Sequence, residues 1–141
     1  MSVYADTSFL VSLYFADAHS ASVARVMQPR PTLYLTPLSE LELVNALELA
    51  LFRQLADASA IRAGQAAFRQ DVEQGVFSLQ PLPATVFAVA ASLARRRSAR
   101  WGTRTLDILH VASALLLHAD RFLTFDARQR RLARAVGLRV R

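Results

Sequence analysis

The sequence predicts an α/β protein, a three-layer α/β/α sandwich with a central parallel sheet of four to five strands. Short β-prone runs alternate with helical segments along the whole chain, which is typical of parallel strands joined by helices. The strand candidates are apolar throughout, as expected when helices cover both faces of a sheet. We expect one domain, residues 1–141, because 141 residues with 53% hydrophobic content suit a single core.

The strand candidates are five short runs, at residues 3–5, 32–35, 76–82, 121–125 and 138–140. The expected helices lie between and after them, at residues 8–15, 19–28, 37–55, 57–74, 84–98, within 103–120 from about Thr105, and at 127–136. Local chemistry fixes several ends. Thr36 offers an N-cap hydroxyl and Pro37 suits the first helical position. The motif "QPRP" at 28–31 breaks the second helix, the fourth stops at Gly75, and Gly137 suits a left-handed cap after the last.

Composition excludes several classes of protein. No apolar run reaches the roughly 18 residues of a membrane-spanning helix. No basic segment precedes the first apolar run, so we expect no signal peptide. The chain has no cysteine, which excludes disulfides, thiolate zinc sites and cysteine nucleophiles. We therefore expect a cytoplasmic protein that does not bind membranes.

Four acids fall at places where this fold class builds its sites, outside the carboxyl ends of the strands near the topological switch point. Asp6 follows the first strand candidate, and Asp126 follows "RFLTF". Asp107 lies in the first turn of the helix from Thr105, and Glu42 lies in the helix after the second strand. The fold can bring all four to one rim.

Each acid also has a purely structural interpretation. Asp6 and Asp107 can stabilise helix N-termini, Asp126 can be an N-cap, and Glu42 can be a solvated helix residue. Together they favour a different account. Two carboxylates about 4 Å apart repel by roughly 4 kcal/mol at an effective dielectric of 20, so a real cluster requires a cation. Oxygen ligands without His or Cys indicate Mg²⁺, with Mn²⁺ as the alternative.

Glu40 is a rival for Glu42 on the same helix. At 100° per residue, Glu40 lies near the middle of the apolar stripe that contains Leu43 and Leu47, whereas Glu42 lies at its edge beside Asn45. An acid at the edge reaches a cleft more easily. Helical spacing favours Glu42 without excluding Glu40.

The charge suggests a polyanionic partner. The net charge is +6, and all 17 basic residues are arginine, which pairs with phosphate through two parallel hydrogen bonds. Two groups flank proposed ligands and are candidates for gripping nucleic acid: Arg95, Arg96, Arg97, Arg100 and Arg104 before Asp107, and Arg128, Arg130, Arg131 and Arg134 after Asp126. The alternative is a solvated helix end. Trp101 is either a base-stacking residue or a packing residue.

Four segments in order resemble the PIN-domain ribonucleases, and the VapC-type toxins of toxin–antitoxin pairs in particular: "YADTSFLVSLY", "LSELELVNAL", "TLDILHVASAL" and "FLTFDARQRRLARAVGL". The resemblance implies a PIN-like sandwich whose acids are Asp6, Glu42, Asp107 and Asp126, and so prefers Glu42 to Glu40. It implies supporting roles for Thr7, Ser8 and Thr124.

That resemblance also implies a function. We expect an endoribonuclease that hydrolyses RNA phosphodiester bonds with Mg²⁺, a cognate antitoxin as partner, and a homodimer. The alternative is a catalytically silent RNA-binding or protein-interaction module on the same fold. His110 is expected to be a packed or partner-facing residue and not a general base, because no acid or nucleophile is spaced to complete a triad.

Overall fold

The computed structural model describes residues 1–141 as one α/β unit of four strands and seven helices. The strands are β1 (Ser2–Ala5), β2 (Thr32–Leu35), β3 (Phe77–Leu79) and β4 (Arg121–Leu123). The helices are α1 (Thr7–Tyr14), α2 (Ser20–Met27), α3 (Pro37–Phe52), α4 (Ala58–Glu73), α5 (Val86–Trp101), α6 (Thr105–Leu116) and α7 (Ala127–Ala135). The predicted fold class is confirmed.

The four strands form one parallel sheet in the order β3-β2-β1-β4. The chain moves outward from β1 to β2 to β3, and then crosses to the opposite side of β1 to form β4. The strand order therefore reverses between β1 and β4. A doubly wound sheet binds its ligands at such a switch point, outside the carboxyl ends of the strands. Asp6 and Asp126 follow these two strands.

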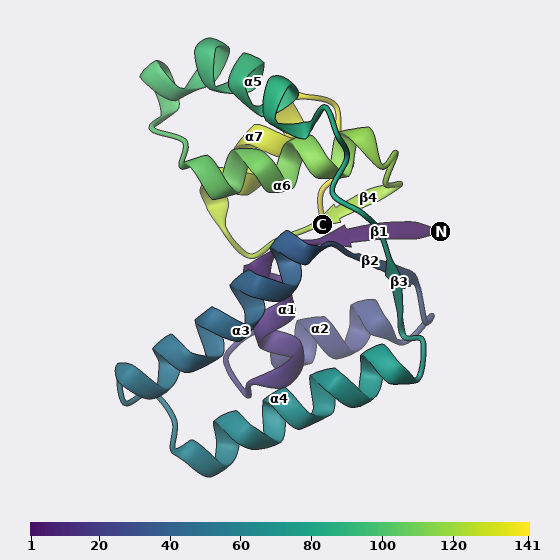
Figure 1. Ribbon diagram of the computed structural model, residues 1–141, viewed down its shortest axis with the longest axis vertical. Coiled ribbons are helices and arrows are strands. Elements are labelled where there is room, and N and C mark those ends of the chain that lie inside the picture. Colours follow the sequence, from purple (N-terminus) through teal and green to yellow (C-terminus); the bar gives the residue numbers. More distant parts are fainter.

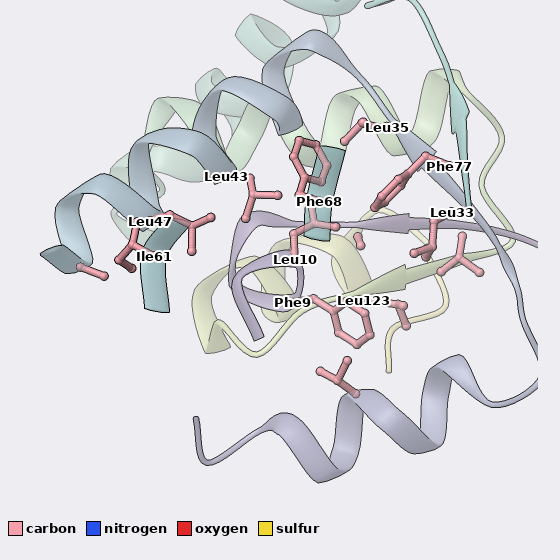
Figure 2. Packing of buried hydrophobic residues seen from close by; sticks show 14 residues of the cluster. Phe9, Leu10, Leu33, Leu35, Leu43, Leu47, Ile61, Phe68, Phe77 and Leu123 are labelled. Carbon is pink, nitrogen blue, oxygen red and sulfur yellow. The ribbon is translucent and has the colours of Figure 1, made fainter. Parts of the chain in front are cut away.

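Helices cover both faces of the sheet, as Figure 1 shows, with α1–α4 below the strands and α5–α7 above them. Each layer has its own apolar core. Phe9, Leu10, Leu43 and Phe68 pack with strand residues in the lower core (Figure 2). The upper core joins the sheet to α5, α6 and α7. No helix is both long enough and apolar enough to span a membrane.

Differences from the predicted elements lie at their ends. The run at 138–140 forms no strand of its own, and Val140 makes a single parallel bridge with Phe122 beside β4. The run at 121–125 stops being a strand at Leu123, so Thr124, Phe125 and Asp126 are free to turn at the sheet edge. Thr36 caps α3 through its side chain, and Pro37 is the first helical residue, as predicted.

Gly64 marks the closest approach of two helices in the lower layer. A Cβ built on Gly64 would lie 2.5 Å from the backbone oxygen of Tyr14, so a side chain here forces α1 and α4 apart. We expect Gly64→Ala to lower the free energy of unfolding by about 1–3 kcal/mol, the usual cost of overpacking. Urea denaturation measures this change in the free energy of unfolding, and Ala63→Ser, on the exposed face of α4, is the control. Equal stability of Gly64→Ala and wild type would contradict this packing.

Candidate metal centre and active site

Asp6 is the most deeply placed of the four acids. It directly follows β1, caps α1 and has no exposed surface. Its Oδ1 accepts hydrogen bonds from Ser8 Oγ at 2.6 Å and the Phe9 backbone N–H at 3.0 Å, and its Oδ2 accepts one from Thr124 Oγ1 at 2.5 Å. Burial raises the pKa of Asp6 despite these three donors. A carboxylate kept out of water at this cost is typical of a functional site.

Glu42 reaches the same edge from α3 and joins a buried polar chain. Its Oε2 accepts a hydrogen bond from Thr7 Oγ1 at 2.7 Å and contacts His110 Nε2. Tyr4 bonds the other ring nitrogen of His110 at 2.8 Å. Burial opposes the charged imidazole, but Tyr4 and Glu42 outweigh it and raise the pKa of His110 to about 9. Burial likewise opposes ionisation of Glu42, and the bond and charge of His110 leave its pKa lowered.

Asp107 and Asp126 share two partners. Arg104 Nε donates to Asp107 Oδ2 at 2.8 Å, and Arg104 NH2 approaches Asp126 Oδ2 at 3.4 Å. Gln129 Nε2 donates to Asp107 Oδ1 at 3.0 Å, while its backbone N–H donates to Asp126 Oδ1 at 2.9 Å. The hydrogen bond to Asp107, together with the negative charges of Asp107 and Asp126, raises the pKa of Arg104. A guanidinium thus stands between two of the proposed ligands.

Shared hydrogen-bond partners connect Asp6, Asp107 and Asp126 at one sheet edge. Glu42 belongs to a separate chain that runs through Thr7 and His110. Thr124 Oγ1 bonds Asp6 and also accepts from the Asp126 backbone N–H at 2.9 Å. Direct convergence is absent, because no group of three acidic or histidine side chains is arranged to hold a metal ion. The side chains bring charges of both signs to the rim, and the carboxylates bind protein donors instead of one another.

Comparison with known proteins identifies the fold family. The PIN domain family profile matches residues 3–135, which is nearly the whole chain. The chain belongs to the PIN-domain family. The resemblance found in the four sequence segments is thereby confirmed at the level of the family. Comparison with curated protein sequences gives no significant match.

Solved structures agree with a PIN domain. VapC20 from Mycobacterium tuberculosis, described as a sarcin–ricin loop cleaving toxin, gives a TM-score of 0.70 at 19% identity over 96% of this chain and 95% of that one. FitAcB from Neisseria gonorrhoeae gives 0.67 at 17% identity over 98% and 95%. VapBC2 from Rickettsia felis, bound to a promoter DNA fragment, gives 0.66 at 13% identity over 100% and 98%. At such identities the likeness shows a shared fold.

The structure places the predicted supporting residues in this PIN domain beside the acids. Thr7 bonds Glu42, while Ser8 and Thr124 both bond Asp6. Glu40 is exposed, whereas Glu42 takes part in the buried chain. Of the predicted RNA-binding arginines, Arg104 lies between two acids. Arg95, Arg96, Arg100 and Arg128 are exposed, and Arg97 is half-buried beside Trp101.

Two residues of the site had no predicted role. His110 is buried as expected, but its partner is Glu42, 68 positions earlier in the chain. Gln129 was not among the predicted site residues, yet it is buried and donates a hydrogen bond to Asp107. A weak signal existed for both. His110 lies one turn after Asp107, and Gln129 lies three positions after the capping Asp126, where side chains on one helix face meet.

Proposed function

We propose that this chain is a divalent-metal-dependent endoribonuclease and the toxin of a toxin–antitoxin pair. The observation that carries the proposal is the presence of four acids from four separate elements along the switch-point edge of a PIN domain. Asp6 is fully buried there, and a binding surface for phosphate has no use for a buried carboxylate without a cation.

The chemistry of these residues suits such a cation, although their side chains do not converge on one point in this structure. Asp6, Glu42, Asp107 and Asp126 would hold it, and their all-oxygen donor set suits Mg²⁺, with Mn²⁺ as a substitute. The Arg104 guanidinium already bridges two of these acids in place of a cation. The buried Gln129 Oε1 beside Asp107 has no hydrogen-bond partner, so it can accept a bond from a water at the site.

The chain's own groups position the reaction. Ser8, Thr124 and the Phe9 N–H hold Asp6 in one orientation, while His110 and Thr7 hold Glu42. Arginines outside the acid edge offer phosphate contacts for the RNA backbone. When bound, a divalent ion lowers the pKa of water and offsets charge on the phosphoryl oxygens. No nucleophilic side chain is required.

Arg104 has a measurable consequence for metal binding. Because its guanidinium neutralises Asp107 and Asp126, Arg104→Gln should bind Mn²⁺ about twofold to fivefold more tightly, since one exposed ion pair is worth at most about 1 kcal/mol. Calorimetry without RNA measures this. Arg100→Gln, also exposed but without an acidic partner, is the control. Weaker Mn²⁺ binding by Arg104→Gln would contradict the counter-ion role.

RNA cleavage tests the enzymatic proposal. Wild type and Asp6→Asn are incubated with RNA in Mg²⁺, in Mn²⁺ and in EDTA. We expect cleavage by wild type in either metal, none in EDTA and none by Asp6→Asn. RNA binding without cleavage in every metal would favour the catalytically silent module. Equal cleavage by both proteins would contradict the role of Asp6.

An apolar groove supports the antitoxin as partner. A hollow of about 320 Å³ runs beside α3, between α3 and the start of α6. It is lined by Thr7, Leu38, Leu41, Glu42, Asn45, Ala46, Leu49 and Leu106. Leu41 is 67% exposed, and Phe52 at the end of the same helix is 83% exposed. Such a groove suits an amphipathic helix, and an occupant would reach Glu42.

Growth measurements test the toxin role. Expression of the chain alone should stop growth, Asp6→Asn should not, and a small neighbouring gene should restore growth. Harmless expression of folded, active protein would contradict this role. Homodimer formation belongs to the same proposal, and sedimentation of the purified chain measures it.

A further inference from the structure

Trp101, the only tryptophan of the chain, gathers two arginines from different helices. It is the last residue of α5 and packs half-buried against the upper core. The guanidinium carbon of Arg97, one turn earlier, lies 4.8 Å from the ring centroid. That of Arg131, on α7, lies 4.2 Å away. The indole thus holds two cations in place.

Neither arginine has an acidic partner. The ion pairs of the chain involve Arg104 and His110 only. Arginine side chains usually lose considerable rotamer freedom when they bind. Cation–π contacts worth about 0.5–1 kcal/mol at exposed sites reduce that loss, because the guanidinium groups are already ordered. Ordered, unpaired guanidinium groups suit an anionic ligand.

A hollow lies beside this cluster. Its volume is about 240 Å³, and it is lined by Trp101, Thr103, Ala127, Arg128 and Arg131. Drug-sized ligands occupy pockets of roughly 300–1,000 Å³, so this one suits a single phosphate or base. Thr103 immediately precedes Arg104, and Ala127 immediately follows Asp126. The hollow therefore adjoins the Arg104–Asp126 pair.

We propose that Arg97, Trp101 and Arg131 form a subsite that binds one nucleotide of single-stranded RNA next to the scissile bond. The proposal rests on the proposed ribonuclease function and names where its substrate is held. Arg131 and Arg97 contact phosphate, and the exposed part of the Trp101 ring or a guanidinium plane stacks on the base. Because this contact lies beside the acids without belonging to them, it serves binding and not chemistry.

Trp101 itself provides the measurement, since its fluorescence is the only indole signal. Single-stranded RNA of about 12 nucleotides, within the usual range of binding-site sizes, is added to the protein in EDTA, which prevents metal-dependent cleavage. We expect saturable quenching of Trp101. Arg131→Gln should weaken binding about fivefold and lower the salt slope by about one, as for one lost phosphate contact.

The control is Arg62→Gln, which removes the same charge from an exposed position on α4, in the opposite layer. Its affinity for the RNA should stay within about twofold of that of wild type. In Mg²⁺, Arg131→Gln should raise KM and leave kcat unchanged. An absence of quenching, equal effects of Arg131→Gln and Arg62→Gln, or tighter binding of polyglutamate than of RNA would overturn the subsite. Quenching that responds to Arg131→Gln without any cleavage in Mg²⁺ would support the subsite and count against the ribonuclease.

Discussion

Replacing Asp6 by asparagine should abolish RNA cleavage while stabilising the folded chain. Burial disfavours the ionised form of the Asp6 carboxyl group, and its raised pKa reflects that cost. Asparagine is nearly the same size, and its Oδ1 can still accept from Ser8 and Phe9, while the Thr124 hydroxyl can turn to accept from Nδ2. The variant thus loses the charge and keeps the contacts.

The two effects of Asp6→Asn differ in size. Loss of a metal-binding carboxylate should reduce kcat/KM by about 10³-fold, since metal ions supply several kcal/mol of transition-state stabilisation and each 1.36 kcal/mol is tenfold in rate. The free energy of unfolding in EDTA should rise on the order of 1 kcal/mol, the size of a typical stabilising substitution at a functional site. A variant that is both inactive and less stable would assign Asp6 a structural role.

The stability gain of Asp6→Asn should depend on pH. A pKa raised in the folded state contributes stability below the unfolded value, near 3.8, and this contribution is lost as pH rises through the folded pKa. Wild type should therefore match the variant in acid and fall behind it as the pH increases. Denaturant midpoints measured in EDTA from pH 3.5 to neutrality, at intervals of about 0.5, follow the difference. A difference independent of pH would contradict the assignment.

Replacing His110 by glutamine should produce the largest loss of stability among the site variants. His110 is fully buried, with contacts to Glu42 and Tyr4. Its raised pKa, about 9, means that the imidazolium is the main form at neutral pH and pairs with the Glu42 carboxylate. Glu42 is partly buried, and removing His110 leaves its carboxylate without this partner. We expect a loss of roughly 2–3 kcal/mol.

The pH range in which His110→Gln loses stability follows from the pKa shifts of His110 and Glu42. The His110 contribution is complete below the unfolded pKa of 6.5 and is lost as pH rises through about 9. The Glu42 contribution is lost in acid, because its pKa is lowered by folding. The stability difference between wild type and His110→Gln should therefore be largest near pH 6 and shrink as the pH rises from 6.5 to about 9. Urea denaturation in EDTA measures it.

His118→Asn is the control for the His110 prediction. His118 is exposed and has a φ of +52°, a conformation that asparagine tolerates. The free energy of unfolding of His118→Asn should equal that of wild type across the same pH series. A His110→Gln variant with the same unfolding profile as His118→Asn would show that the Glu42 contact contributes nothing.

The sequence alone could place the acids on elements but not orient their side chains. Asp6 and Asp126 follow strands, and strand ends in a parallel sheet share one edge, so their placement followed from the alternation of elements. The choice of Glu42 over Glu40 came mainly from the family resemblance. In the structure, Glu42 contacts Thr7 and His110, whereas Glu40 remains exposed.

Long-range pairs explain what the sequence could not supply. His110 and Glu42 are 68 positions apart, and no local spacing connects them. Arg104 is a candidate RNA contact because it belongs to a basic run, and the structure adds a local partner, Asp107, three residues later. The run at 138–140 has the composition of a strand, and yet only Val140 bridges β4.

Binding of Mn²⁺ to the purified, RNA-free chain tests most directly whether the four acids form one metal site. Calorimetry compares wild type with Asp6→Asn, Asp107→Asn and the control Glu48→Gln, whose carboxylate bonds Gln65 away from the edge. We expect Mn²⁺ to bind wild type and Glu48→Gln with equal affinity, and both aspartate variants to lose Mn²⁺ binding. Equal Mn²⁺ affinity in all four proteins would contradict the account.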